Sequence, residues 1–142
     1  MKANADQAAP STPNAARRLR VLIADDYDHA AELLATLVDF EDGLHGIAVN
    51  DGSEALVSAL SHRPDVAVLD VDMPHVDGLA AARALREHFG TAAPLLIALT
   101  GRGDLDSIDK AQVFDQVLTK PVDLPLLIAL LEAVRGEVQK TQ

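Results

Sequence analysis

The feature that most constrains the fold is a regular alternation of short apolar runs with segments of helical period. The runs are rich in Val, Leu, Ile and Ala, and between them apolar residues recur every three or four positions. The pattern predicts strands over 20–24, 45–49, 65–69, 94–99 and 116–119, and helices near 28–41, 53–61, 78–89, 104–113 and 123–137. Strict alternation of this kind predicts an α/β domain, in which a parallel sheet has helices on both faces.

The boundaries of these elements are supported by glycine and proline, which fall almost entirely between them. Pro125 lies in the first turn of the last helix, where its missing N–H has no helical partner to lose. Ser53 and Asp123 are predicted to cap the helices that follow them, and Asp77-Gly78 to form a turn and cap.

Acidic, hydroxyl and basic residues stand where four of the apolar runs end. Asp25-Asp26 follow the first run, Asp70 the third, Thr100 the fourth and Lys120 the fifth. The carboxyl ends of parallel strands share one edge of the sheet, which is where such sheets build ligand sites. Carboxylates, a hydroxyl and an ammonium together would suit a divalent cation and a phosphoryl group. Taken singly, each residue is as well explained by a turn or a helix cap, so the inference rests on their joint placement.

Length and composition predict one domain with an aliphatic core. The chain has 142 residues, is 49% hydrophobic and has no Trp. Residues 1–18 contain almost no large apolar side chain, so we expect a disordered N-terminal tail, followed by a folded domain over 19–137 and a C-terminal tail over 138–142. We expect no room for a further output domain.

Charge and residue usage argue against several other functions. The net charge of −10 disfavours direct nucleic-acid binding, and the one basic cluster, Arg17, Arg18 and Arg20, is interpreted as a solvated entry to the first strand. No apolar run is long enough for membrane insertion, and no signal peptide is apparent. Cysteine is absent, which suits the cytoplasm, where we expect the protein to act. The histidines show no spacing typical of zinc ligands.

In its motifs the chain resembles the receiver domains of two-component response regulators, over about residues 19–135. The resemblance is carried by Asp25-Asp26, by Asp70-Val-Asp-Met-Pro-His-Val-Asp-Gly78, by Ala98-Leu-Thr-Gly101 and by Leu118-Thr-Lys-Pro-Val-Asp123. Among receivers, the chain is most similar to those attached to, or serving, hybrid sensor kinases. The resemblance implies a flavodoxin-like, doubly wound, five-stranded parallel sheet of order 2-1-3-4-5 with five helices.

The same resemblance implies a role for each polar residue. Asp70 would be the phosphoacceptor, taking a phosphoryl group from a phosphohistidine in a reaction that needs Mg²⁺. The metal ligands would be Asp25, Asp26, Asp70 and the backbone carbonyl of Asp72. Thr100 would contact a phosphoryl oxygen. Lys120 would pair with Asp70 before phosphorylation and with the phosphoryl group afterwards, and its bond to Pro121 would be cis.

Residues around this site would tune it. We hypothesise that Asp72 and Arg102 form an ion pair that restricts the access of water to Asp70. The conformational switch position, often aromatic in relatives, is Val117, so aromatic switching is not expected. The stretch from Thr100 to Lys120 is about two residues shorter than in the family, with Val113 at a common glycine position, which predicts a reshaped fourth helix.

The function expected from this resemblance is that of a single-domain receiver. It would not be an enzyme, beyond its own phosphotransfer and autodephosphorylation. Its partners would be a histidine kinase or histidine phosphotransfer protein and a downstream protein, through phosphorylation-dependent binding or a phosphorelay. One alternative is a phosphorylation-independent interaction module with the same fold. Another is a haloacid-dehalogenase-like phosphatase, for which Asp26-Tyr27-Asp28 offers only a superficial motif.

Overall fold

The computed structural model describes residues 17–27, 29–73, 77–101, 105, 108 and 112–140. Five strands in this part form one parallel sheet: β2 (Leu19–Ala24), β3 (Leu44–Val49), β4 (Val66–Asp70), β5 (Leu95–Thr100) and β6 (Gln116–Thr119). Their order across the sheet is β3-β2-β4-β5-β6. In order along the chain this is 2-1-3-4-5, so the predicted topology is confirmed.

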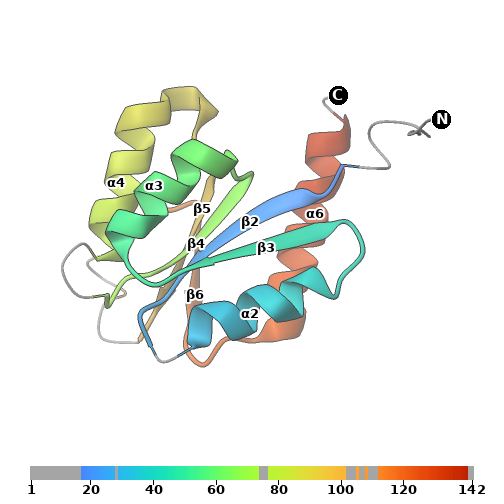
Figure 1. Ribbon diagram of the computed structural model, residues 1–142, viewed down its shortest axis with the longest axis horizontal. Coiled ribbons are helices and arrows are strands. Elements are labelled where there is room, and N and C mark those ends of the chain that lie inside the picture. The colour runs from blue at the N-terminus through green and yellow to red at the C-terminus, as the bar shows by residue number, and fades with distance from the viewer. Residues whose placement is uncertain are drawn as a thin grey trace.

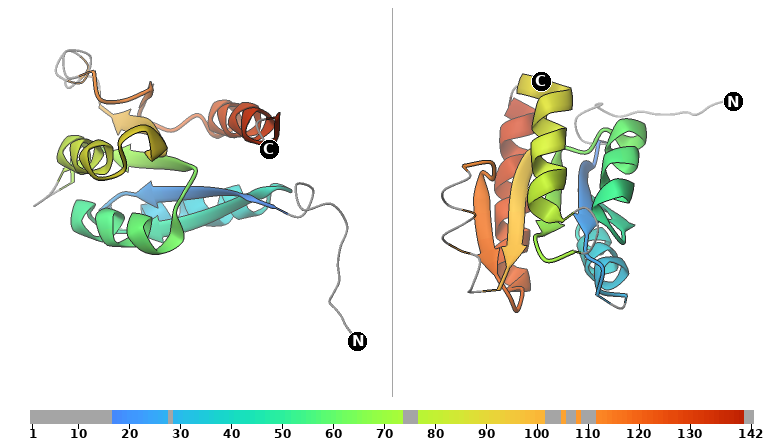
Figure 2. Two further views of the ribbon diagram at one scale, coloured as in Figure 1. Left: turned by 90° about the horizontal axis from the view of Figure 1, so that it is seen from above. Right: turned by 90° about the vertical axis from the view of Figure 1, so that its left-hand side faces the viewer.

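Helices cover both faces of the sheet. α2 (Ala30–Asp39) and α6 (Leu124–Lys140) lie on one face, and α3 (Gly52–His62) and α4 (Gly78–Phe89) lie on the other (Figures 1 and 2). A short 3₁₀ helix, η1 (Gly90–Ala92), follows α4. The described residues thus contain four α-helices rather than the five predicted. The predicted helix near 104–113 falls largely outside the described residues; within it, Leu105 and Ile108 have helical backbone.

The core is divided by the sheet into two apolar layers. Along β2, Val21 and Ile23 pack toward α2 and α6, whereas Leu22 and Ala24 pack toward α3 and α4. Every residue of β4 is buried, because helices lie on both sides of this central strand. Burial on both faces explains why the strand sequence is a continuous apolar run instead of an alternating one.

The helix caps confirm two of the predicted starts and correct a third. The side chain of Asp77 accepts a hydrogen bond from the backbone N–H of Ala80, and that of Asp123 from Leu126. The cap of α3 is Asp51 rather than Ser53, since Asp51 has extended backbone and accepts from the N–H of Glu54. Ser53 already lies within the helix, so its side chain is misplaced for capping.

Both ends of the domain differ in detail from the expected boundaries. Arg17 and Arg18, assigned to the N-terminal tail by the sequence, form ion pairs with Asp65 and Asp39. Residues 1–16 lie outside the described residues. α6 continues to Lys140, so residues 138–140 of the expected C-terminal tail are helical, and Val138 packs against the core. No helix in the described ranges combines the length and apolar character needed to cross a bilayer.

Candidate functional site

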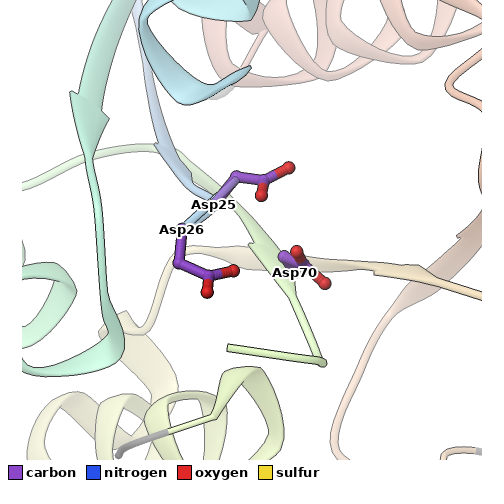
Figure 3. Close-up of side chains that lie close together, drawn as sticks. All are labelled: Asp25, Asp26 and Asp70. Atoms are coloured by element: carbon purple, nitrogen blue, oxygen red, sulfur yellow. The ribbon is translucent and has the colours of Figure 1, made fainter. Parts of the chain in front are cut away.

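Three carboxylates meet at the carboxyl edge of the sheet. Asp25 and Asp26 directly follow β2, and Asp70 is the last residue of the neighbouring β4 (Figure 3). One carboxylate oxygen from each lies within 4.8 Å of the others. Asp70 is only 2% exposed and Asp25 only 8%, whereas Asp26 is exposed. Parallel pairing of β2 with β4 therefore brings together acidic groups that are far apart in the sequence.

The two oxygens of Asp70 have different partners. Oδ1 accepts a hydrogen bond of 2.9 Å from the backbone N–H of Asp72. Oδ2 accepts one of 2.8 Å from Nζ of Lys120, which forms a salt bridge. Lys120 follows β6 and precedes a cis peptide bond to Pro121. The acid is thus held in one orientation by a fixed backbone donor and by a cation that is one-third exposed.

The electrostatics of the cluster show a deficit of positive charge. Burial raises the pKa of Asp25, and the hydrogen bond and negative charge of Asp70 raise it further, although the N–H of Tyr27 and the charge of Lys120 oppose this. For Lys120, burial alone would lower the pKa, but Asp70, Asp25 and Asp72 outweigh it and the pKa is raised. Burial first, and then the neighbouring Asp70, therefore destabilise the ionised form of Asp25. An oxygen-rich donor set with excess negative charge is the kind that binds Mg²⁺.

An open pocket of about 620 Å³ lies over these groups. Its lining residues are Asp25, Asp26, Tyr27, Ala30, Asp70, Asp72, Lys120, Pro121 and Val122. The pocket exposes part of the acidic cluster and Lys120 to incoming molecules, while the apolar side chains of Val122 and Pro121 form part of its wall. It is therefore a site that a phosphoryl donor could enter.

Thr100 lies close to Asp70 in the sheet but is not among the described residues that line the pocket. It is the last residue of β5, directly after Leu99, which pairs with Asp70 across the strands. Its side chain is fully buried, and its hydroxyl donates a hydrogen bond of 2.8 Å to the carbonyl oxygen of Gly101. To donate to a group on Asp70 instead, this hydroxyl would have to give up its hydrogen bond to Gly101.

The residues expected to tune the site are only partly described. The side chain of Asp72 lines the pocket, but Arg102 lies outside the described residues, so the predicted Asp72–Arg102 ion pair remains a hypothesis. Val117 lies in the edge strand β6 and its side chain is 38% exposed. His75 is likewise outside the described residues.

One positioning residue was assigned only to a turn by sequence reasoning. Gly78, the first residue of α4, lies against the end of β4 so closely that an added Cβ would be 2.4 Å from the carbonyl oxygen of Asp70. The absence of a side chain at Gly78 lets α4 begin directly against the backbone of Asp70. The Asp-Gly dipeptide was the only signal, and it indicates a turn without revealing this contact.

Comparison with known proteins agrees with this geometry. The family of response regulator receiver domains matches residues 21–132. The response regulator MprA of Mycobacterium avium (strain 104) is 37% identical over 82% of this chain and 50% of its own length. The DNA-binding response regulator MtrA of Mycolicibacterium smegmatis is 32% identical, with the same two shares. The chain therefore spans about half the length of these curated relatives.

Solved structures give the same result. The REC domain of AraT, a response regulator from Geobacillus stearothermophilus, is similar with a TM-score of 0.72 and 31% identity, over 87% of this chain and 98% of that one. The receiver domain of the Francisella response regulator 1452 has a TM-score of 0.74 and 26% identity, over 85% of this chain and 99% of that one. With the sheet order and the acidic edge described above, these matches show that the chain belongs to the response regulator receiver domain family.

Proposed function

We propose that this protein accepts a phosphoryl group on Asp70 from a phosphohistidine of a histidine kinase or histidine phosphotransfer protein. Receiver domains are phosphoacceptor signalling modules, and phosphorylation on aspartate is typical of the family. The observation that carries the proposal for this chain is the placement of Asp70: it is buried, hydrogen-bonded on both oxygens, and paired with Lys120 at the base of an open acidic pocket.

The chemistry requires one bond to form and one to break. A carboxylate oxygen of Asp70 attacks phosphorus, the bond from phosphorus to the imidazole nitrogen breaks, and its electron pair stays on that nitrogen. The products are an acyl phosphate on Asp70 and a neutral imidazole on the donor, because the other ring nitrogen of the phosphohistidine carries a proton or the freed nitrogen takes one from water. Lys120, now paired with Oδ2, would transfer its contact to a phosphoryl oxygen and balance part of the added negative charge.

We assign the Mg²⁺ ligands to the carboxylates of Asp25, Asp26 and Asp70 and to the backbone carbonyl of Asp72. When bound, Mg²⁺ screens the repulsion between the carboxylate and the incoming phosphoryl group. The clustered carboxylate oxygens and the raised pKa of Asp25, caused first by burial and then by Asp70, support a cation at this position. Without a cation the three acids would repel both one another and an anionic donor.

After phosphorylation, Thr100 would exchange its hydrogen bond to Gly101 for one to the phosphoryl group, which would alter the loop that follows β5. A downstream protein, or a second phosphotransfer partner in a relay, would recognise this state. Asp72, with Arg102, would tune the lifetime of the acyl phosphate by limiting the access of water. With Val117 in place of an aromatic residue, the signal would pass through the backbone of this region instead of through the rotation of a ring.

The test is intact mass spectrometry after incubation with acetyl phosphate, with Mg²⁺ and with chelator. We expect a gain of one phosphoryl group in the wild type only with Mg²⁺, and none in Asp70→Asn. Asp77→Asn is the matched control, since asparagine preserves the cap of α4 and should leave labelling intact. Labelling of Asp70→Asn, or labelling that is equal with chelator, would contradict the assignment.

The alternative is an interaction module of the same fold that works without phosphorylation. The aliphatic Val117 at the switch position favours it, because an exposed valine cannot act as the usual aromatic indicator. A wild-type protein that is folded but never labelled, and that binds its partner as well as Asp70→Asn does, would support this alternative.

A further inference from the structure

A second charged site lies at the opposite edge of the sheet from Asp70. Three arginines, Arg17, Arg18 and Arg20, stand at the start of β2, and His45 stands near the start of the neighbouring β3. These residues line a surface hollow of about 330 Å³, and every residue of its lining is basic. The whole chain has 22 acidic and only 12 lysine and arginine residues, so this basic hollow is opposite in sign to the negative net charge of the protein.

Two of the arginines are organised by a single carboxylate on the loop before β4. Oδ1 of Asp65 accepts a hydrogen bond of 2.8 Å from a terminal nitrogen of Arg17. Oδ2 of the same carboxylate accepts one of 2.9 Å from the backbone N–H of Arg20. Asp65 thereby fixes Arg17 beside the strand and leaves the guanidinium of Arg20 without a carboxylate partner among the described residues.

The other side of the hollow is organised by Asp39, the last residue of α2. Its Oδ1 accepts hydrogen bonds from the backbone N–H of Gly46 at 2.9 Å and contacts Nδ1 of His45 at 3.0 Å. Arg18 reaches the same oxygen at 3.5 Å and also donates to the carbonyl oxygen of Leu44. His45 is thus held through Nδ1 and Arg18 through a terminal guanidinium nitrogen, and Nε2 of the His45 ring takes no part in these contacts.

Among the described residues the cluster keeps an excess of positive charge. Three guanidinium groups are matched there by two carboxylates, those of Asp39 and Asp65, so one positive charge remains before any contribution from His45. Arg20 and His45 are register partners on adjacent strands, which sets their side chains on the same face of the sheet. Arg20 therefore lines the hollow without a carboxylate partner among the described residues, together with Arg17, one of whose terminal nitrogens is bound to Asp65.

We propose that this arginine hollow binds a small phosphate-bearing anion, such as inorganic phosphate, pyrophosphate or a phosphomonoester. Guanidinium groups donate two parallel hydrogen bonds to phosphate oxygens, and a bound phosphate would balance the excess positive charge of the hollow. Within the described part of the chain, the only aromatic ring that lines the hollow is the imidazole of His45, so recognition is of the phosphate and not of a stacked base. A net charge of −10 would repel a long polyanion from the rest of the surface.

The test is calorimetric titration of the full chain with sodium phosphate and with pyrophosphate, at constant ionic strength in chloride. Chelator is included so that divalent cations do not recruit phosphate to the acidic pocket. We expect saturable binding at one site, weakened about tenfold or more in Arg20→Gln, because a charge-assisted pair of hydrogen bonds is lost. Arg83→Gln removes the same charge from the exposed surface of α4 and should change affinity less than about twofold.

Mapping by amide chemical shifts locates the anion and tests the reasoning independently. Shifts at Arg20 and His45, with Asp70→Asn binding as tightly as wild type, are expected. Shifts confined to Asp70 and Lys120 would place the anion in the acidic pocket and overturn the proposal. Equal weakening by Arg20→Gln and Arg83→Gln, or no saturation, would also overturn it by showing general charge attraction only.

A lipid headgroup can also present phosphate, and a vesicle experiment distinguishes that source from a free anion. Vesicles of phosphatidylcholine with phosphatidic acid are sedimented with the protein, and vesicles of phosphatidylcholine alone are the control. The proposal expects free phosphate or pyrophosphate to bind. Binding to the acidic vesicles without any binding of the free anions would overturn the assignment of a small-molecule ligand.

Discussion

Gly78→Ala tests how tightly the start of α4 is packed against the end of β4, the strand that carries Asp70. The new Cβ would lie 2.4 Å from the carbonyl oxygen of Asp70, 2.8 Å from its carbonyl carbon and 2.9 Å from Cα of Val71. Carbon atoms in good contact are about 3.5–4.0 Å apart, so the space is short by about 1 Å. All three neighbours are backbone atoms, and no side-chain rotation can relieve the overlap. Either α4 or the end of β4 must move.

The cost can be worked from two opposing effects. Overpacking of this kind costs about 1–3 kcal/mol. The better helix propensity of alanine returns at most about 1 kcal/mol. We expect the free energy of unfolding to fall by about 1–2 kcal/mol, which lowers the folding constant by a factor of about 5–30. Urea unfolding followed by far-ultraviolet circular dichroism measures this, and under conditions where the variant is folded its phosphorylation by acetyl phosphate should be slower because Asp70 is displaced.

Gly136→Ala provides the control within the same chain. Gly136 lies inside α6, and a Cβ there would meet no atom within 4 Å. The same substitution should therefore stabilise the protein by about 0.5–1 kcal/mol and leave labelling of Asp70 unchanged. If Gly78→Ala were as stable as Gly136→Ala, the close approach of α4 to β4 would be refuted.

Three further predictions concern the acidic cluster and a helix cap. Because burial, and next the neighbouring Asp70, raises the pKa of Asp25 above 3.8, ionisation of this acid destabilises the folded state. Asp25→Asn should then raise the free energy of unfolding at pH 7 in chelator, a gain that disappears as the pH falls below 3.8, where the wild-type carboxyl is protonated in both states. Mg²⁺ should stabilise the wild type against urea by binding the folded state, and a gain of equal size in Asp26→Asn would count against Asp26 as a ligand. Asp51→Ala should cost about 1 kcal/mol, whereas Ser53→Ala should change stability by less than about 0.5 kcal/mol; a larger loss for Ser53→Ala would restore the sequence-based choice of cap.

The choice between Asp51 and Ser53 shows why local patterns predict elements better than their ends. Both residue types are favourable caps, and each precedes a helical segment. The structure selects Asp51 because the side chain of Glu54 accepts the N–H of Asn50 while Asp51 accepts the N–H of Glu54. These two hydrogen bonds depend on the path of the chain leaving β3, which a pattern of apolar residues does not describe.

For the candidate site, too, the sequence predicted the elements but not the contacts between their side chains. The apolar run before Asp70 indicated a strand buried on both faces, and β4 is fully buried. Which oxygen of Asp70 meets Lys120 could not be derived, since the two residues are 50 positions apart and their contact depends on the packing of three strands. The orientation of the Thr100 hydroxyl toward Gly101 is a rotamer choice in a buried site, so it too was beyond sequence reasoning.

What the sequence by itself determined is the succession of strands and helices and the chemical identity of the groups at the strand ends. Apolar periodicity and turn residues act over a few neighbouring positions, so they can be read locally. Tertiary structure alone decided which of these groups meet: the three carboxylates within 4.8 Å, the close approach of Gly78 to Asp70, and the arginine hollow tied by Asp39 and Asp65. These contacts arise from strand register and helix packing, which join segments that are distant along the chain.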